Sequence, residues 1–161
     1  MTDKITVLGV GNILLKDEGV GVRVVEEMTR RYTFPENVEV LDGGTLGMEL
    51  MRFLLGTDRV IIIDAIDGSL PPGSIYQFEK EAVKTYFREK ISVHDLGIQD
   101  VLAALDVLEK PLQELVVMGV QPAVIDVGLD LTPVVAQSVE PVITKVLALL
   151  ADWKVEVIDR E

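Results

Sequence analysis

Cysteine is absent from the 161-residue chain, and histidine occurs once, at position 94. Without cysteine there can be no disulfide bond, no thiolate metal ligand and no cysteine nucleophile. The single histidine makes His94 the one imidazole available as a base or a metal ligand. The absence of cysteine therefore closes the sulfur route to function.

Basic residues are also few, with 15 lysines and arginines against 27 acidic residues and a formal net charge of −12. Such a charge repels phosphate backbones, so we expect no nucleic-acid partner. The 48% hydrophobic and 26% charged residues are typical of a globular protein. At this length we expect one domain, residues 1–161, with a single substantial core.

Long apolar runs are missing too. No run approaches the roughly 20 residues that span a bilayer. The apolar stretch near the N-terminus ends at Gly9 and is too short and too acidic for a signal peptide. We therefore expect a cytoplasmic protein that does not insert into a membrane.

The apolar runs that are present alternate between strand and helix patterns. Strands are predicted at Ile5–Val10, Val38–Leu41, Arg59–Ala65 and Leu115–Val120, and helices from Val20, from Met48 to Leu55, after His94 and from Thr132 to Leu150. Alternating strands and helices favour parallel pairing through crossovers. The predicted fold class is α/β, a three-layer α/β/α sandwich with a twisted, mostly parallel sheet.

Three local features refine this prediction. Ser74–Phe78 alternates polar and apolar residues, which suits an antiparallel edge strand. Pro141 lies within the last helical pattern, so we expect a kink there or a helix that properly begins near Glu140. Trp153–Ile158 is predicted as a short final strand.

Distinctive polar residues follow three of the predicted strands, and ligand sites in open α/β sheets lie beyond the carboxyl ends of strands. The segment Gly9–Glu18 follows the first strand, and Asp64 closes the third. Asp42, Gly43, Gly44 and Thr45 follow the second strand. His94 precedes a predicted helix and could lie at the same edge.

Two familiar sites are not favoured. Gly9-x-Gly11 followed by Asp42 suggests a dinucleotide-binding loop, but Leu14 stands where the third glycine belongs, and Lys16-Asp17-Glu18 would set two carboxylates against a pyrophosphate. A serine hydrolase is unsupported because no G-x-S-x-G elbow occurs.

A third possibility is a metal site made by Glu18, Asp64 and His94, a mixed oxygen and nitrogen set that suits zinc, nickel or iron. Spacing alone supports it weakly, because the three residues are scattered. Glu18 could instead be an ordinary acid in the first turn of a helix, and Asp64 could cap a turn. His94 could be a helix neighbour without chemistry.

Several segments together resemble the hydrogenase maturation endopeptidases. The resemblance covers essentially the whole chain. It lies in Gly9-Val10-Gly11-Asn12-Ile13-Leu14-Leu15, Asp17-Glu18-Gly19-Val20-Gly21, Leu41-Asp42-Gly43-Gly44-Thr45, Asp64-Ala65, Ser92-Val93-His94 and Gly119-Val120-Gln121-Pro122.

The resemblance implies a peptidase that removes the C-terminal extension from the precursor of a nickel-iron hydrogenase large subunit. It places the nickel contacts on Glu18, Asp64 and His94, with nickel supplied by the substrate rather than held by the free protein. Asp42 would be a general base or a substrate-positioning acid.

Gly43, Gly44 and Thr45 would then contact an extended peptide of the substrate. The same three nickel contacts would equally serve a nickel-sensing chaperone that does not cut its partner. The sequence predicts no particular oligomeric state.

Overall fold

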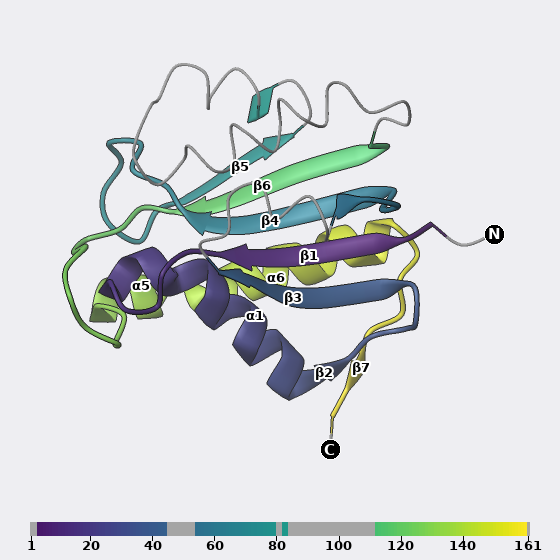
Figure 1. The fold of residues 1–161 in the computed structure, drawn as a ribbon, viewed down its shortest axis with the longest axis horizontal. Coiled ribbons are helices and arrows are strands. Elements are labelled where there is room, and N and C mark those ends of the chain that lie inside the picture. Colours follow the sequence, from purple (N-terminus) through teal and green to yellow (C-terminus); the bar gives the residue numbers. More distant parts are fainter. Residues whose placement is uncertain (1–2, 45–53, 80–81, 84–111, 161) are drawn as a thin grey trace.

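A five-stranded sheet forms the centre of the protein in the computed structural model, which describes residues 3–44, 54–79, 82–83 and 112–160. Its order is β3-β1-β4-β6-β5 (Figure 1). The strands are β1 (Ile5–Val10), β3 (Val38–Gly44), β4 (Arg59–Ala65), β6 (Glu114–Val120) and β5 (Ile75–Glu79). All pairs are parallel except β5 with β6, so the predicted antiparallel edge strand is confirmed.

Two long helices cover one face of this sheet (Figure 1). The 3-10 turn η1 (Lys16–Gly19) leads directly into α1 (Val20–Arg31), and α6 (Val139–Asp152) packs beside α1. Helix α1 turns an apolar stripe to the strands because Val20, Val24 and Met28 recur at helical spacing and are fully buried. The predicted first helix is therefore confirmed, and its start is fixed against the sheet.

The last helical pattern is divided, as Pro141 predicted. The short helix α5 (Pro133–Ala136) ends before Ser138, and α6 then begins at Val139. Pro141 thus lies in the first turn of α6, where its missing N–H leaves no helical hydrogen bond unmade. Ser138 Oγ donates to Gly73 O at 2.6 Å and holds this break against the loop before β5.

By length and composition alone, Pro133–Asp152 could cross a membrane, which the search for long apolar runs did not predict. In the structure the apolar side of this segment packs against the sheet. Val142, Val146 and Leu150 are fully buried there. The core helix of a globular protein passes the same length and composition test, so a single such segment is weak evidence of a membrane span.

The opposite face of the sheet carries a second apolar cluster. Leu8, Ile62 and Val117 are buried there together with Leu54 and Val83. The predicted helix after His94, and most of the one from Met48 to Leu55, lie outside the described residues. The α/β class with a mostly parallel sheet is confirmed.

A second, two-stranded sheet joins β2 (Tyr32–Thr33) to β7 (Ile158–Asp159). The predicted final strand at Trp153–Ile158 is wrong in extent, because Ile158 is the only one of its residues that belongs to a strand. Trp153, Val155 and Val157 pack onto the main core instead of pairing. Strand β2 was not predicted, and at two residues it gives no period to detect.

Candidate active site

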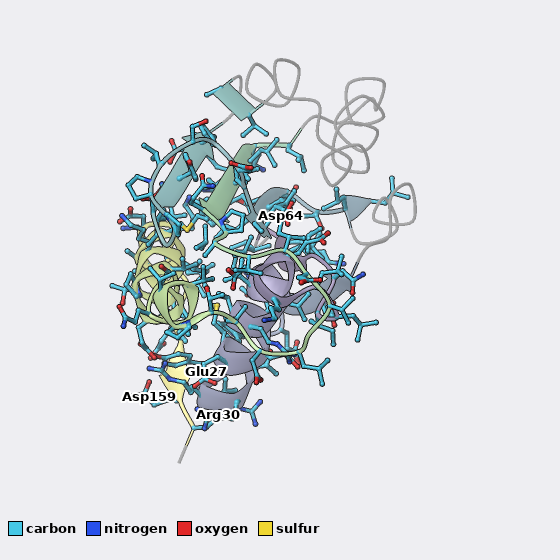
Figure 2. All side chains as sticks on the ribbon, turned by 90° about the vertical axis from the view of Figure 1, so that its left-hand side faces the viewer. Glu27, Arg30, Asp64 and Asp159 are labelled. Atoms are coloured by element: carbon cyan, nitrogen blue, oxygen red, sulfur yellow. The ribbon has the colours of Figure 1, made fainter. Side chains whose placement is uncertain are left out.

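The carboxyl ends of β1 and β4 form the point where the sheet topology reverses. Strands β3 and β4 lie on opposite sides of β1, so the chain leaves β1 in one direction and later returns in the other. Ligands of open α/β sheets bind at such a point. Figure 2 looks onto this edge and shows Asp64 near its centre.

Glycines let the start of α1 lie directly on the strands at this edge. A Cβ on Gly21 would stand 2.1 Å from the carbonyl oxygen of Ile63, and one on Gly9 would stand 2.3 Å from the carbonyl oxygen of Gly21. Both distances are shorter than any real Cβ contact, so only glycine fits. Gly11 has φ +136°, and a Cβ there would meet Glu18 O at 2.0 Å.

These contacts explain the glycines that suggested a dinucleotide loop. Gly9 and Gly11 serve close backbone packing between β1 and the helix that follows. The helix start that would receive a pyrophosphate instead carries two buried acids, Asp17 and Glu18. Two carboxylates there oppose an anion, so the dinucleotide interpretation is not supported.

Glu18 and Asp64 bring two carboxylates to the reversal point. Glu18 is 7% exposed in η1, and Asp64 is 2% exposed at the end of β4. Turn η1 contacts β4, so the two residues belong to adjoining elements. The Asp64 Oδ1 atom accepts a hydrogen bond from Ala65 N at 2.8 Å, which orients that carboxylate. Carboxylate oxygens are common ligands of divalent metal ions, so the chemistry of this donor set fits a divalent cation.

The third predicted nickel contact, His94, lies outside the described residues, as does Thr45. Within the described ranges, no group of three metal-ligating side chains comes together. The structure therefore places two members of the predicted trio at one edge of the sheet, and the assignment of all three as nickel contacts stays a prediction.

Asp42 lies at the end of the edge strand β3 and is exposed. Its Oδ1 accepts from Gly44 N at 2.8 Å, and Gly44 adopts φ +56°, which favours glycine. Gly44 O in turn accepts from Gly11 N at 2.9 Å. The Asp42-Gly43-Gly44 turn is thus joined to the loop that leads to Glu18.

A groove of about 520 Å³ lies beside this turn. It runs between β3 and α1, and Asp42, Val40, Thr29, Arg30 and Arg160 are among its lining residues. Asp42 therefore faces an open groove whose lining carries both arginines and the acid Glu26.

Asp17 is a structural acid that the sequence did not single out. It is fully buried, and its Oδ2 accepts from Ala123 N, Val124 N and Thr132 Oγ1, while its Oδ1 accepts from Thr132 N, at 2.8 to 2.9 Å. Burial alone would raise the pKa of Asp17, but these hydrogen bonds together hold it below its ordinary value of 3.8. An ionised Asp17 thus fixes the segment between β6 and α5 to the loop that carries Glu18.

Gln121 is a second residue that the sequence reasoning missed in this role. It follows β6 directly, is 6% exposed, and its Oε1 accepts from Gly68 N at 2.8 Å and Tyr76 Oη at 2.5 Å. Its Nε2 donates to Asp67 Oδ1 at 2.9 Å. Gln121 thereby shapes the loop immediately after Asp64. The sequence held a signal for Gln121, because it follows a buried apolar strand just as Asp64 does, and that position was the reason for selecting Asp64.

Fold and site together define an α/β protein with an acidic site at the reversal point of its sheet. The model of the hydrogenase maturation protease family matches residues 22–149. Hydrogenase 2 maturation protease of Escherichia coli K12 is 45% identical over 159 residues, covering 98% of this chain and 97% of that protein. HupD, a hydrogenase expression/formation protein of Bradyrhizobium diazoefficiens, is 44% identical over 157 residues, covering 96% and 82%.

Solved structures agree with this match. The hydrogenase maturating endopeptidase HybD from E. coli superposes with a TM-score of 0.92 at 45% identity, covering 98% of both chains. HybD from Thermococcus kodakarensis, a [NiFe] hydrogenase maturation protease, gives 0.76 at 29% identity, covering 91% of this chain and 98% of its own. The chain belongs to the hydrogenase maturation protease family and is a peptidase. The predicted family and enzyme class are confirmed.

Proposed function

We propose that this peptidase removes the C-terminal extension from the precursor of a nickel-iron hydrogenase large subunit after nickel has been inserted into that precursor. Membership of the family supports action on a hydrogenase large-subunit precursor. The observation that carries the nickel step is the placement of two buried carboxylates, Glu18 and Asp64, at the reversal point of the sheet. Two carboxyl groups at a ligand-binding edge supply the oxygen atoms that a divalent cation binds.

Nickel enters this proposal as part of the substrate. Glu18 and Asp64 would offer oxygen atoms, and His94 would add a neutral ring nitrogen. Three protein ligands leave coordination positions open, which the precursor's own ligands would fill. The site would then bind strongly only when metal and precursor arrive together, so that cleavage reports completed nickel insertion.

Asp42 is the proposed general base or positioning acid. Its Oδ1 is held by Gly44 N, so the carboxylate is oriented at the end of the strand. As a base, Asp42 would take a proton from the water that attacks the scissile carbonyl carbon, and the amide nitrogen would leave protonated. Nickel bound in the precursor would add positive charge beside that carbonyl.

The peptide itself would lie along the end of β3. In the described part of the chain, β3 pairs only with β1, so its other side offers backbone donors and acceptors. An extended peptide binds such an edge by adding a strand. Gly43 and Gly44 would let the two backbones approach closely, and Thr45 would continue the contact.

The test is incubation of the purified protein with its cognate precursor, prepared with and without nickel, followed by mass spectrometry of the large subunit. We expect loss of the C-terminal peptide from the nickel-loaded precursor alone. Equal cleavage of both forms would overturn the role of nickel. No cleavage of either form by the wild-type protein would overturn the proposed processing reaction.

Substitutions separate the site from the scaffold. Glu18→Gln and Asp64→Asn keep side-chain shape but remove charge, so each should fold and lose at least a hundredfold of processing rate. Glu39→Gln is the matched control, because Glu39 is a half-exposed carboxylate on β3 that forms a surface ion pair with Lys4. Processing by Glu18→Gln at the control's rate would remove Glu18 from the site.

A further inference from the structure

An exposed apolar surface lies on the loops beside the candidate site. It consists of Leu14, Val124, Ile125, Val127 and Leu129, which we call the apolar loop patch. Val127 is 81% exposed, Leu129 59% and Leu14 57%. Most of the exposed large apolar side chains in the described part of the chain belong to this patch. Single exposed apolar residues are ordinary, whereas a cluster marks an interaction surface.

Backbone hydrogen bonds hold the two loops of this patch together. Gly128 N donates to Leu14 O at 2.9 Å, and Lys16 N donates to Gly128 O at 3.0 Å, on either side of a bridge between Leu15 and Gly128. Asp17 N donates to Val124 O at 3.2 Å. The buried Asp17 carboxylate also holds the start of this segment, because it accepts hydrogen bonds from Ala123 N and Val124 N. The patch is therefore preorganised, which lowers the entropic cost of binding a partner.

The patch is continuous with the edge that carries the site. Leu14 is four residues before Glu18. The segment that carries Val124–Leu129 follows β6, the strand that pairs with β4 and so lies next to the strand end that carries Asp64. Figure 2 shows this segment, in pale green, curving around the start of α1 beneath Asp64. A protein seated on the patch would hold its own chain against the reversal point.

We propose that the apolar loop patch docks the folded body of the hydrogenase large-subunit precursor, separately from the peptide that is cut. The proposal rests on the processing function proposed above. A peptidase that acts on one folded precursor gains affinity and selectivity from contacts beyond the cleaved segment.

Charge argues against a second copy of this chain as the occupant. The patch is bordered by the exposed acids Asp126 and Asp130 and by the partly exposed cations Lys16 and Arg23. The whole chain carries −12, so two copies would repel one another as they approach. The same net charge opposes an anionic membrane surface. A precursor surface of apolar side chains would complement the patch.

The test replaces both of the most exposed side chains in the double variant Val127→Asp/Leu129→Asp. Leu55→Asp is the matched control, because Leu55 is 53% exposed and lies before β4, at the amino edge of the sheet. Initial rates of cleavage are measured against the concentration of nickel-loaded cognate precursor, with thermal unfolding as the check on folding. We expect KM to rise at least tenfold in the double variant with kcat within twofold, and no change in the control.

Two further measurements make every outcome decisive. Biolayer interferometry of the immobilised precursor should show the same tenfold loss of affinity, and it judges the patch even if no cleavage is seen. Sedimentation velocity reports self-association. Unchanged affinity in the double variant would overturn the proposal, and so would a wild-type dimer that the double variant dissociates while precursor affinity stays the same.

Discussion

Asp17→Asn tests whether a buried carboxylate holds the loops of the site together. An asparagine can place one oxygen where Oδ2 stands and keep the bonds from Ala123 N, Val124 N and Thr132 Oγ1. Its amide nitrogen then faces Thr132 N, which loses its acceptor. Leaving one buried donor unsatisfied costs about 1–3 kcal/mol. The remaining hydrogen bonds also weaken because their acceptor is no longer charged, and each loses about 1 kcal/mol of stabilisation at most.

These terms are not fully additive, so we expect Asp17→Asn to lower the free energy of unfolding by about 3 kcal/mol at pH 7. Urea denaturation followed by circular dichroism measures the difference. Asp126→Asn is the matched control, because Asp126 is exposed in the same segment and accepts a hydrogen bond from its neighbour Val127 N. The control should change stability by less than about 0.5 kcal/mol.

The pH dependence gives an independent check. Hydrogen bonds lower the folded pKa of Asp17 below its ordinary value of 3.8, although burial opposes them. A depressed folded pKa contributes stability that is fully present above the unfolded pKa and is lost as pH falls through the folded pKa. The difference between wild type and Asp17→Asn should therefore be constant from pH 8 to pH 5 and shrink below pH 4. A variant within 1 kcal/mol of wild type at pH 7, or a difference that grows in acid, would refute the reasoning.

Two other substitutions test the packing around the site. Gly21→Ala should destabilise the protein by more than about 3 kcal/mol in urea denaturation, because its Cβ would meet backbone at 2.1 Å. Gly56→Ala, with open space around the added Cβ but φ +78°, should cost only about 1–2 kcal/mol, and equal losses would contradict the close-packing argument. Gln121→Leu should cost about 2 kcal/mol and slow precursor processing, because three hydrogen bonds that shape the loop after Asp64 are lost. Processing at the wild-type rate would show that this loop does not position the substrate.

Much of the fold could be predicted because its signals are local. The run Arg59–Ala65 is continuously apolar, and such a run becomes a buried parallel strand. The polar alternation of the Ser74–Phe78 segment predicted an antiparallel edge strand, and β5 is one. Pro141 predicted the start of α6 to within one residue of Glu140, because the N–H that proline lacks is dispensable only in the first turn of a helix. The two-residue strand β2 escaped prediction and β7 was predicted with the wrong extent, since their pairing joins segments more than 120 residues apart.

The candidate site was predicted less completely. Asp64 could be recognised because an acid that closes a run of four apolar residues stands at the carboxyl end of a strand, where ligands bind. Asp17 could not be distinguished from Glu18, its neighbour, because their different roles depend on partners from residues 123–132. The exposure of the apolar side chains in that segment could not be predicted either, because the sequence of a short loop does not show which of its side chains face the solvent.

The sequence by itself determined the main strands, the first and last helical segments and the identity of the acids available for chemistry, because periodicity and residue type are local properties. The family was expected from the resemblance of several motifs along the whole chain. Only the tertiary structure decided that Asp17 is a buried loop anchor, that Gly9 and Gly21 serve close packing, and that Leu14 lies beside Gly128. Each of these three roles depends on contacts between segments that are far apart in the chain. The order of strands in the sheet decides which segments meet, and that order is a property of the whole fold.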